Sequence, residues 1–295
     1  MKFTVYIVNA FSCKNRGGNP AGVVVGASGL QTSQMQKIAA DVGLSETAFI
    51  TSFSKIHQEI RFFTPLAEVN LCGHATIASY HLLGKLNLIT PGRYKMTTRA
   101  GEQDIEYQAD GLVRMTQNLP IFGPVLPPEP VADCLGLLPK DLILEQEVPV
   151  QIASTGLHKI FVPVRSIKRL NQIIPQFDKI ERFSRENNTI GMYCYTLETV
   201  EKSTAHCRNF APVVGILEDA ATGTSAAALS CVLYQHEVLD QSSSKHFLSF
   251  EQGFAINTPA RIMVNLHTPN RQIQRVQVAG YGYIHAQNQI DITNG

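Results

Sequence analysis

The sequence lacks an excess of charge of either sign, since 25 Lys and Arg residues stand against 24 Asp and Glu residues, for a net charge of +1. A surface without net positive charge does not attract phosphate backbones, so we expect no nucleic-acid partner. Long apolar runs are also missing. Residues 226–233 form one of the longest, and this run falls far short of the ~20 residues that a membrane-spanning helix needs. We therefore expect no membrane association.

Paired cysteines are absent as well. The six cysteines are scattered and none forms a C-x-x-C pair. This pattern is typical of thiols in a reducing compartment and not of a disulfide framework. The apolar stretch at residues 3–10 is too short for a secretion signal and contains Asn9. We predict a cytoplasmic protein.

Metal-binding and nucleotide-binding motifs are missing too. The nine histidines show no H-x-x-x-H or H-x-H spacing, and no glycine-rich phosphate loop follows a predicted strand. The sequence therefore predicts no metal site and no nucleotide cofactor.

What is present is an alternation of strand-like and helical segments. The first half predicts strands at 4–8, 22–25, 46–50 and 59–63, a helix capped by Thr32 and Ser33, and a second helix from Leu71 to about Leu86. The second half predicts strands at 158–164, 190–195 and 204–210. It also predicts a helix capped by Ser166 that carries Ile167 to Ile174, and a final helix after Gly223.

A proline-rich stretch at residues 120–130 separates the halves, and we interpret it as the linker because proline neither continues a helix nor donates to a sheet. We predict one domain at residues 1–118, completed by a C-terminal strand at about 282–295, and a second domain at 119–281. The motifs Phe-Thr-Pro before Gly73 and Phe-Ala-Pro before Gly223 indicate a duplicated unit, the alternative being chance similarity of short motifs.

The helices that begin near Gly73 and Gly223 are the centre of this interpretation. Residues 224–235 leave no wide polar face, which is typical of a helix buried on all sides, and residues 75–86 resemble them. A helix amino end carries amides without backbone partners and a partial positive charge, and glycine lets a ligand approach closely. We expect the two ends to bind an anion such as a carboxylate. The alternative is that both glycines only permit tight turns.

Three side chains near these segments suit proton transfer. Glu46 lies among apolar residues, where loss of solvation would raise the pKa of a base that takes a proton from carbon; the alternative is an exposed strand-edge carboxylate. Asp219 precedes the second helix by a few residues, so its carboxylate could reach the same site. The alternative is a helix-capping or loop aspartate. His74 lies in the first turn of the first helix, either as a neutral proton relay or as a buried histidine with satisfied hydrogen bonds.

Cys72 beside His74 raises a third possibility. A cysteine at a helix amino end has a lowered pKa, and Cys–His pairs serve nucleophilic catalysis and proton abstraction. The alternative is a buried cysteine that acts as a small hydrophobic residue.

Six segments, in the same order along nearly the whole chain, resemble the PhzF-like family of phenazine-biosynthesis isomerases. They are Gly18–Val24, Leu44–Phe49, Phe63–Pro65, Leu71–Thr76, Glu218–Gly223 and Gln252–Gly253. The resemblance implies an α+β fold of the diaminopimelate epimerase type, with two pseudo-symmetric domains, each a β-barrel-like sheet around a central helix. It also implies an active site between the domains, a homodimer, and no cofactor.

By the same resemblance, Glu46 matches the general acid/base, while His74 and Asp219 match residues that bind substrate and assist proton relay. The amides around Gly73, Gly223 and Thr224 match the groups that bind the substrate carboxylate. Related racemases use two cysteines, and here Cys72 matches the first while Ala221 stands at the second. Thr224 replaces the usual Ser, and Asn257-Thr258-Pro259 replaces a common Gly-Arg-Pro.

We therefore predict a cofactor-independent isomerase that moves a proton at carbon of a small carboxylate-bearing metabolite, with Glu46 as the base. Two alternatives remain open. One is a catalytically silent metabolite-binding protein with the same fold, suggested by the departures at Thr224 and at residues 257–259. The other is a thiol-dependent epimerase that uses Cys72.

Overall fold

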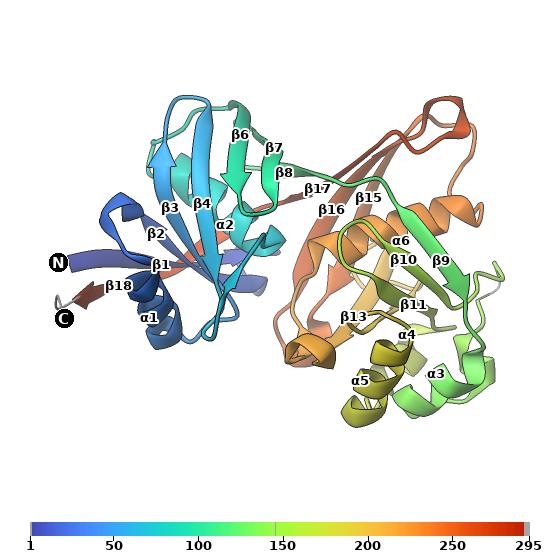
Figure 1. Ribbon diagram of the computed structural model, residues 1–295. Coiled ribbons are helices and arrows are strands. Elements are labelled where there is room, and N and C mark those ends of the chain that lie inside the picture. Colours follow the sequence, from blue (N-terminus) through green and yellow to red (C-terminus); the bar gives the residue numbers. More distant parts are fainter. Residues whose placement is uncertain (1, 145, 292–295) are drawn as a thin grey trace. The chain divides into compact units, whose positions relative to one another are not determined.

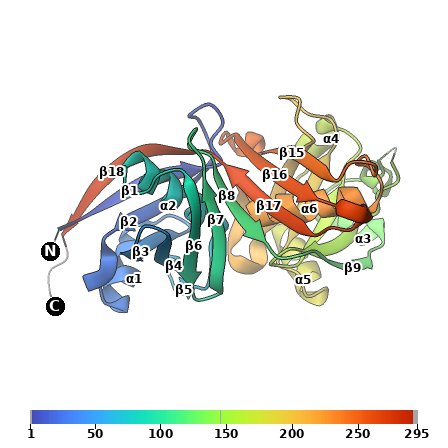
Figure 2. The same cartoon turned by 90° about the horizontal axis from the view of Figure 1, so that it is seen from above.

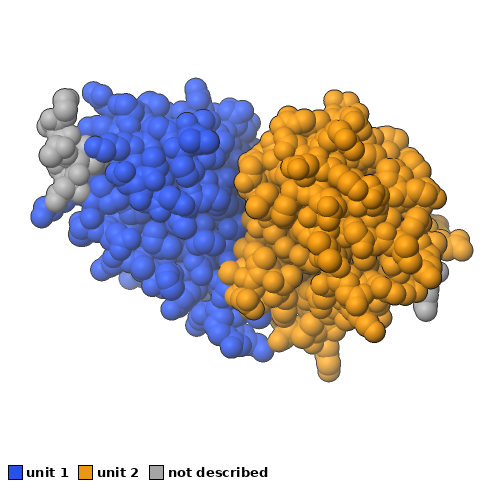
Figure 3. Space-filling model, turned by 90° about the horizontal axis from the view of Figure 1, so that it is seen from below, with its two compact units in different colours: residues 1–116, 279–295 blue, residues 117–278 orange. Residues whose placement is uncertain are grey.

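The computed structural model describes residues 2–144 and 146–291. It divides into two compact units, coloured separately in Figure 3: unit 1 comprises residues 1–116 and 279–295, and unit 2 comprises residues 117–278. The domain boundaries expected from the sequence lie at 118 and at about 281. Among the described residues, no helix is both long and apolar enough to cross a membrane.

Unit 1 is a curved sheet around one helix. Its helices are α1 (Thr32–Val42) and α2 (Gly73–Lys85), and its strands are β1 (Lys2–Ala10), β2 (Asn19–Val25), β3 (Thr47–Phe53), β4 (His57–Phe63), β5 (Glu68–Val69), β6 (Gly92–Thr98), β7 (Gly101–Tyr107), β8 (Val113–Gln117) and β18 (Gly282–Asp291). The strands pair in the order β18-β1-β2-β3-β4-β6-β7-β8, and β5 adds to β4.

Helix α2 is the core element of this unit. Every residue from Ala75 to Leu83 is buried, and the helix contacts β1, β2, β3 and β18 (Figures 1 and 2). Helix α2 has no wide polar face, so water can reach none of its sides without contacting apolar residues. The helix is therefore stable only where the sheet covers it on all sides. The predicted central helix is confirmed.

The C-terminal strand belongs to unit 1, as predicted. Strand β18 pairs antiparallel with β1 from Lys2 opposite Asp291 to Ala10 opposite Gly282, with an irregularity between Ile7 and Val8. The last four residues of the predicted strand, 292–295, lie outside the described residues.

Unit 2 repeats the plan. Its strands are β9 (Ile121–Val125), β10 (Gln151–Ser154), β11 (Lys159–Pro163), β12 (Met192–Thr196), β13 (Ala205–Ala211), β14 (Ile216–Asp219), β15 (Lys245–Gln252), β16 (Ala260–His267) and β17 (Arg275–Gly280), and its helices are α3 (Pro128–Leu135), α4 (Ile167–Asn171), α5 (Phe177–Glu186) and α6 (Gly223–Gln235). Helix α6 is buried from Ser225 to Tyr234 and contacts β10 and β16.

The strand pairing shows the duplication directly. In unit 1 the successive pairs β1–β2, β2–β3, β3–β4, β4–β6 and β6–β7 alternate between antiparallel and parallel. In unit 2 the pairs β10–β11, β11–β12, β12–β13, β13–β15 and β15–β16 follow the same alternation. A short strand, β5 or β14, precedes the central helix in each unit. The predicted duplication is therefore confirmed.

The proline-rich stretch is not an unstructured linker, and this prediction was wrong. It contains β9 and the start of α3. Pro128 is the first residue of α3, where the missing N–H costs nothing, and Pro124 lies at a register irregularity between β9 and β10, where no ladder bond is lost.

Two helix ends also differ from the prediction. Gln31, not Thr32 or Ser33, is the N-cap of α1. The Gln31 amide donates to Oε1 of Gln34, and the Gln34 amide donates to the Gln31 carbonyl. Ser166 caps α4 as predicted, but this helix ends at Asn171 and does not reach Ile174. The backbone amide of Ile174 instead donates to the carbonyl of Leu135 in α3.

Candidate active site

In unit 1 the candidate site is built on the amino end of α2. Cys72 is the N-cap in an extended conformation, and its carbonyl accepts from both the amide and the hydroxyl of Thr76, at 3.0 and 2.7 Å. No side chain of the described residues caps this end. A Cβ placed on Gly73 would have no atom within 4 Å, so the backbone of the first turn is open to a ligand.

Glu46 lies in the connection between α1 and β3, and its side chain contacts this turn. Helix α1 ends at Gly43 with a positive φ of 67°, and the chain then turns back so that the Glu46 carbonyl accepts from the Gly22 amide at 3.1 Å, just before β3. The Glu46 side chain is 16% exposed, so it is not the exposed strand-edge carboxylate of the alternative interpretation.

His74 connects the acidic group and the thiol. Its Nε2 lies 3.4 Å from Oε2 of Glu46 and 3.5 Å from Oγ of Ser45. Its Nδ1 lies 3.4 Å from Sγ of Cys72. Oε2 of Glu46 is buried and has no hydrogen-bond partner of suitable geometry among the described residues. The structure thus brings Glu46, Cys72 and His74 together, with Oε2 of Glu46 at ion-pair distance from His74.

In unit 2 the corresponding position holds a buried hydrogen-bond network around Asp219. Asp219 ends β14, and Thr222, the N-cap of α6, donates its hydroxyl to the Asp219 carboxylate. The Thr222 oxygen accepts from Nδ2 of Asn209 at 2.7 Å and from Nε2 of Gln252 at 3.1 Å. Because both donors occupy its lone pairs, the single hydroxyl proton is directed at Asp219.

Buried residues hold this network in place. Gln252 also donates to the Asp219 carbonyl at 2.8 Å and accepts from the Tyr193 hydroxyl at 3.0 Å. Nζ of Lys159 donates to Oδ1 of Asn209. Lys159, Tyr193 and Gln252 are each at most 2% exposed. Burial lowers the pKa of Lys159 to about 8, with Asp219 opposing this shift through its negative charge.

The remaining predicted residues also lie at the amino end of α6. Gly223 is its first residue and is buried. The Thr224 carbonyl accepts from the Thr155 hydroxyl at 3.0 Å, and its methyl group lies 3.8 Å from where a Cβ on Gly156 would stand. The extra methyl of Thr224 is therefore accommodated beside residues 155–156.

Sequence reasoning missed part of this network. Asn209 directly precedes the Phe-Ala-Pro motif, and Gln252 belongs to a segment of the family resemblance, so both had a signal that was not used. Lys159 and Tyr193 had none, because a single polar residue in an apolar strand has no distinctive spacing.

Thr222→Val is expected to remove the Thr222 acceptor from the Asn209 amide, one of two acceptors from the Gln252 amide, and one hydroxyl donor from the Asp219 carboxylate. Each buried polar group left unpaired costs about 1–3 kcal/mol, so the free energy of unfolding should fall by about that amount or more. Thr222→Ser keeps the hydroxyl and is the matched control. Urea unfolding followed by circular dichroism measures the difference, and equal midpoints for the two variants would contradict the network.

Lys159→Met is expected to change how stability depends on pH. The pKa of Lys159 is lowered to about 8 by burial, from an ordinary value of 10.5, so above about pH 8 the unfolded chain binds more protons than the folded one. The free energy of unfolding of the wild type should rise relative to Lys159→Met by about 2 kcal/mol between about pH 7.5 and about pH 9.5. Urea titrations at both pH values measure it; parallel curves would show that Lys159 has an ordinary pKa.

Comparison with known proteins defines the class first. A hydroxyproline epimerase from Agrobacterium vitis, solved with bound trans-4-hydroxy-L-proline, superposes with a TM-score of 0.63 at 11% identity, covering 98% of this chain and 92% of that one. This likeness shows the fold, which is that of the proline racemases and diaminopimelate epimerases, as predicted.

The family follows from closer relatives. The model of the family described as phenazine biosynthesis-like proteins matches residues 8–287, and the chain belongs to this PhzF family of isomerases. An uncharacterized isomerase of Clostridium acetobutylicum is 32% identical over 288 residues, 95% of each chain. The trans-2,3-dihydro-3-hydroxyanthranilate isomerase of Pseudomonas chlororaphis is 29% identical over 94% of this chain and 95% of its own. A PhzF-family protein of Bacillus anthracis superposes with a TM-score of 0.88 at 28% identity, covering 99% of this chain and 100% of that one.

Proposed function

We propose that this isomerase moves a proton at carbon of a small carboxylate substrate, without a cofactor, with Glu46 as the general acid/base. The observation that carries the proposal is the contact between Glu46 and His74 at the open amino end of α2. Oε2 of Glu46 accepts no hydrogen bond from any residue that the structure describes, so it is available to take a proton from a C–H bond.

His74 would take part by holding the base and passing the proton. Its imidazole lies between the Glu46 carboxylate and the Cys72 thiol, and Ser45 contacts the same nitrogen as Glu46. A ring with a contact on each nitrogen can accept at one and donate at the other. In this proposal the proton leaves carbon to Glu46, and the same carboxyl group or His74 returns it to a second carbon.

The substrate carboxylate would be bound by the amides at the amino end of α2, around Gly73. These amides carry the positive end of the helix dipole and stabilise both the carboxylate and the negative charge that develops as the proton leaves. In unit 2 the Thr222 hydroxyl orients the Asp219 carboxylate, which supports the proposed role of Asp219 in binding a polar group. The substrates named for the relatives, dihydrohydroxyanthranilate and hydroxyproline, are both small carboxylates.

A screen of small carboxylates in deuterated water, followed by NMR, tests the proposal. The expected result is that one class of metabolite gains deuterium at a single carbon and is converted to an isomer in the absence of added cofactor. Conversion that requires an added cofactor, or that proceeds without any exchange of carbon-bound hydrogen, would contradict it. The predicted homodimer and cytoplasmic location remain proposals.

A second candidate mechanism uses the thiol. Sγ of Cys72 lies 3.4 Å from Nδ1 of His74, which is the arrangement of an activated cysteine. In this alternative Cys72, not Glu46, takes the proton, and Ala221 offers no second thiol. Inactivation by Cys72→Ala with retention of activity in Glu46→Gln would favour it.

A further inference from the structure

The group formed by Glu46, Cys72 and His74 has the composition of a metal site as well as that of an acid/base pair. One donor atom of each residue lies within 4.8 Å of the other two. Nε2 of His74 lies 3.4 Å from Oε2 of Glu46 and 4.0 Å from Sγ of Cys72. All three residues belong to unit 1.

These separations can be compared with those that a bound zinc ion would impose. With Zn–S at about 2.3 Å and Zn–N and Zn–O at about 2.0–2.2 Å, tetrahedral ligands place N and O about 3.3–3.5 Å apart and S and N about 3.5–3.6 Å apart. The Glu46–His74 distance already falls in this range, and the Cys72–His74 distance exceeds it by a few tenths of an ångström. The separation between a carboxylate oxygen of Glu46 and Sγ of Cys72 lies within 4.8 Å, against about 3.6 Å around zinc, so the Cys72 side chain would have to move to complete the set.

Two further observations point to a ligand at this position. Oε2 of Glu46 is buried and accepts no hydrogen bond within residues 2–144 and 146–291, so it offers a lone pair to an incoming cation. Gly73, between two of the donors, leaves open space where a side chain would stand. Three protein ligands with an open fourth position are the arrangement of catalytic zinc sites, where water or substrate supplies the last ligand.

We propose that Glu46, Cys72 and His74 bind a zinc ion, and that zinc bound there inhibits the isomerase. A thiolate, an imidazole and a carboxylate form a donor set that favours zinc over magnesium or calcium, which prefer oxygen alone. The ion would occupy the lone pair with which Glu46 takes the proton, so metal and substrate proton compete for one oxygen. Binding rests on the geometry alone, and the inhibition rests on the proposed function.

Spacing along the sequence does not indicate this set. Cys72 and His74 are two residues apart, whereas Glu46 lies far earlier in the sequence, in the connection between α1 and β3. The three residues therefore form no short metal-binding motif. The fold brings the third donor to the helix.

The binding is tested with cobalt(II) on the full chain after removal of metal and in the presence of a reductant without thiols. Coordination by a cysteine gives a thiolate-to-cobalt charge-transfer band, and zinc should remove this band at one ion per chain. Cys72→Ala should abolish the band. Cys13→Ala should keep it, because Cys13 is a partly exposed thiol outside the cluster and serves as the matched control.

His74→Ala provides a quantitative check. Loss of a direct ligand should weaken zinc binding by more than the roughly 10–100-fold that follows loss of an outer partner of a ligand. No charge-transfer band in the wild type, or an equal band in Cys72→Ala, would overturn the proposed site.

The inhibition is tested separately by following solvent deuterium exchange into the substrate while zinc is added. Exchange should fall as zinc saturates the site, return when a chelator is added, and be unaffected by magnesium. A cobalt band in a chain that exchanges no substrate would refute the proposed function and leave the metal site standing. Normal exchange at saturating zinc would overturn the inhibition.

Discussion

Glu46→Gln is expected to lower the rate of solvent-hydrogen exchange into the substrate by about 10²–10⁴-fold, the usual contribution of a positioned general acid/base. The amide keeps the size of the side chain and its position beside His74 but cannot accept a proton at the pH of the reaction. The measurement is the rate of deuterium incorporation by NMR, with the substrate that the screen identifies. Exchange at the wild-type rate would rule out Glu46 as the base.

The control for this variant is a measure of substrate binding, because the amides at the helix ends are unchanged. The dissociation constant of Glu46→Gln should remain within a few-fold of the wild type while turnover falls.

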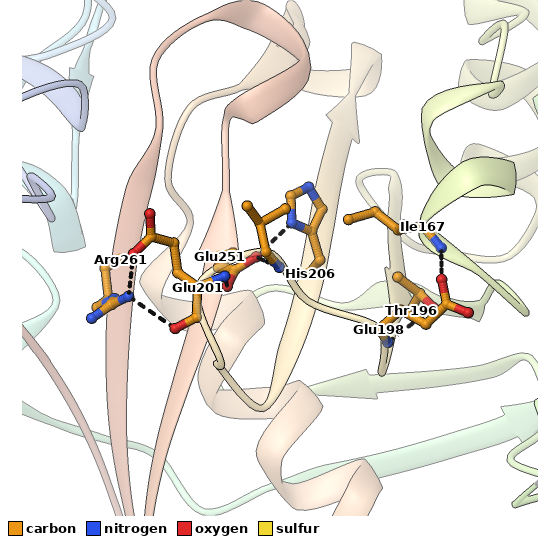
Figure 4. A network of polar contacts seen from close by, with 8 residues as sticks. Ile167, Thr196, Glu198, Glu201, His206, Glu251 and Arg261 are labelled. Carbon is orange, nitrogen blue, oxygen red and sulfur yellow. Dashed lines mark hydrogen bonds and ion pairs between the residues drawn. The ribbon is translucent and has the colours of Figure 1, made fainter.

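Glu251→Ala is expected to destabilise the protein by about 3 kcal/mol or more, because it removes the acceptor of three hydrogen bonds. Glu251 and His206 are 1% and 2% exposed, and Oε2 of Glu251 lies 2.7 Å from Nδ1 of His206 (Figure 4). The same carboxylate accepts from the amides of Val200 at 2.9 Å and Glu201 at 2.6 Å. The variant removes the acceptor of all three donors. Urea unfolding at neutral pH measures the loss.

Glu201→Ala is the matched control. The Glu201 side chain pairs with Arg261 at 3.5 Å, but the two groups are 39% and 34% exposed, so water and salt screen the pair (Figure 4). Its removal should cost less than about 1 kcal/mol. Equal effects of Glu201→Ala and Glu251→Ala would show that burial does not set the strength of these contacts.

The hydrogen bonds of Glu251 also predict how the free energy of unfolding depends on pH in acid. Burial acts to raise the pKa of Glu251, but the hydrogen bonds from His206 and from the two amides outweigh it, and the net pKa is lowered from its usual value of 4.5. A lowered carboxylate pKa contributes stability above the unfolded value that is lost as pH falls through the folded value. The wild type should therefore lose stability below about pH 4.5 more steeply than Glu251→Ala.

The general plan of the molecule was accessible from the sequence because it rests on strong local signals. An almost entirely apolar stretch at residues 226–233 must be buried, and paired Gly73 and Gly223 after matching Phe-x-Pro motifs indicate repetition. The motifs around Glu46, His74 and Asp219 then indicated the family. Both the buried helices and the repeated strand pairing are present in the structure.

The missing parts depend on long-range contacts. The linker prediction failed because a helix or strand accepts proline wherever the backbone N–H of that position makes no hydrogen bond. Pro128, the first residue of α3, occupies such a position. The support of Asp219 could not be predicted, because Lys159, Asn209 and Gln252 lie on three separate strands, and only the sheet brings them together.

The pairing of β1 with β18 has a consequence for biosynthesis. Unit 2 is one continuous segment, whereas unit 1 is interrupted by it, so the chain that emerges first from the ribosome lacks the strand that covers the edge of β1. Domains generally fold as units during synthesis, and the closure of a loop that spans unit 2 adds an entropic cost. Unit 2 can thus reach its final structure first, while the open edge of β1 must stay protected from other nascent chains until β18 has been synthesised.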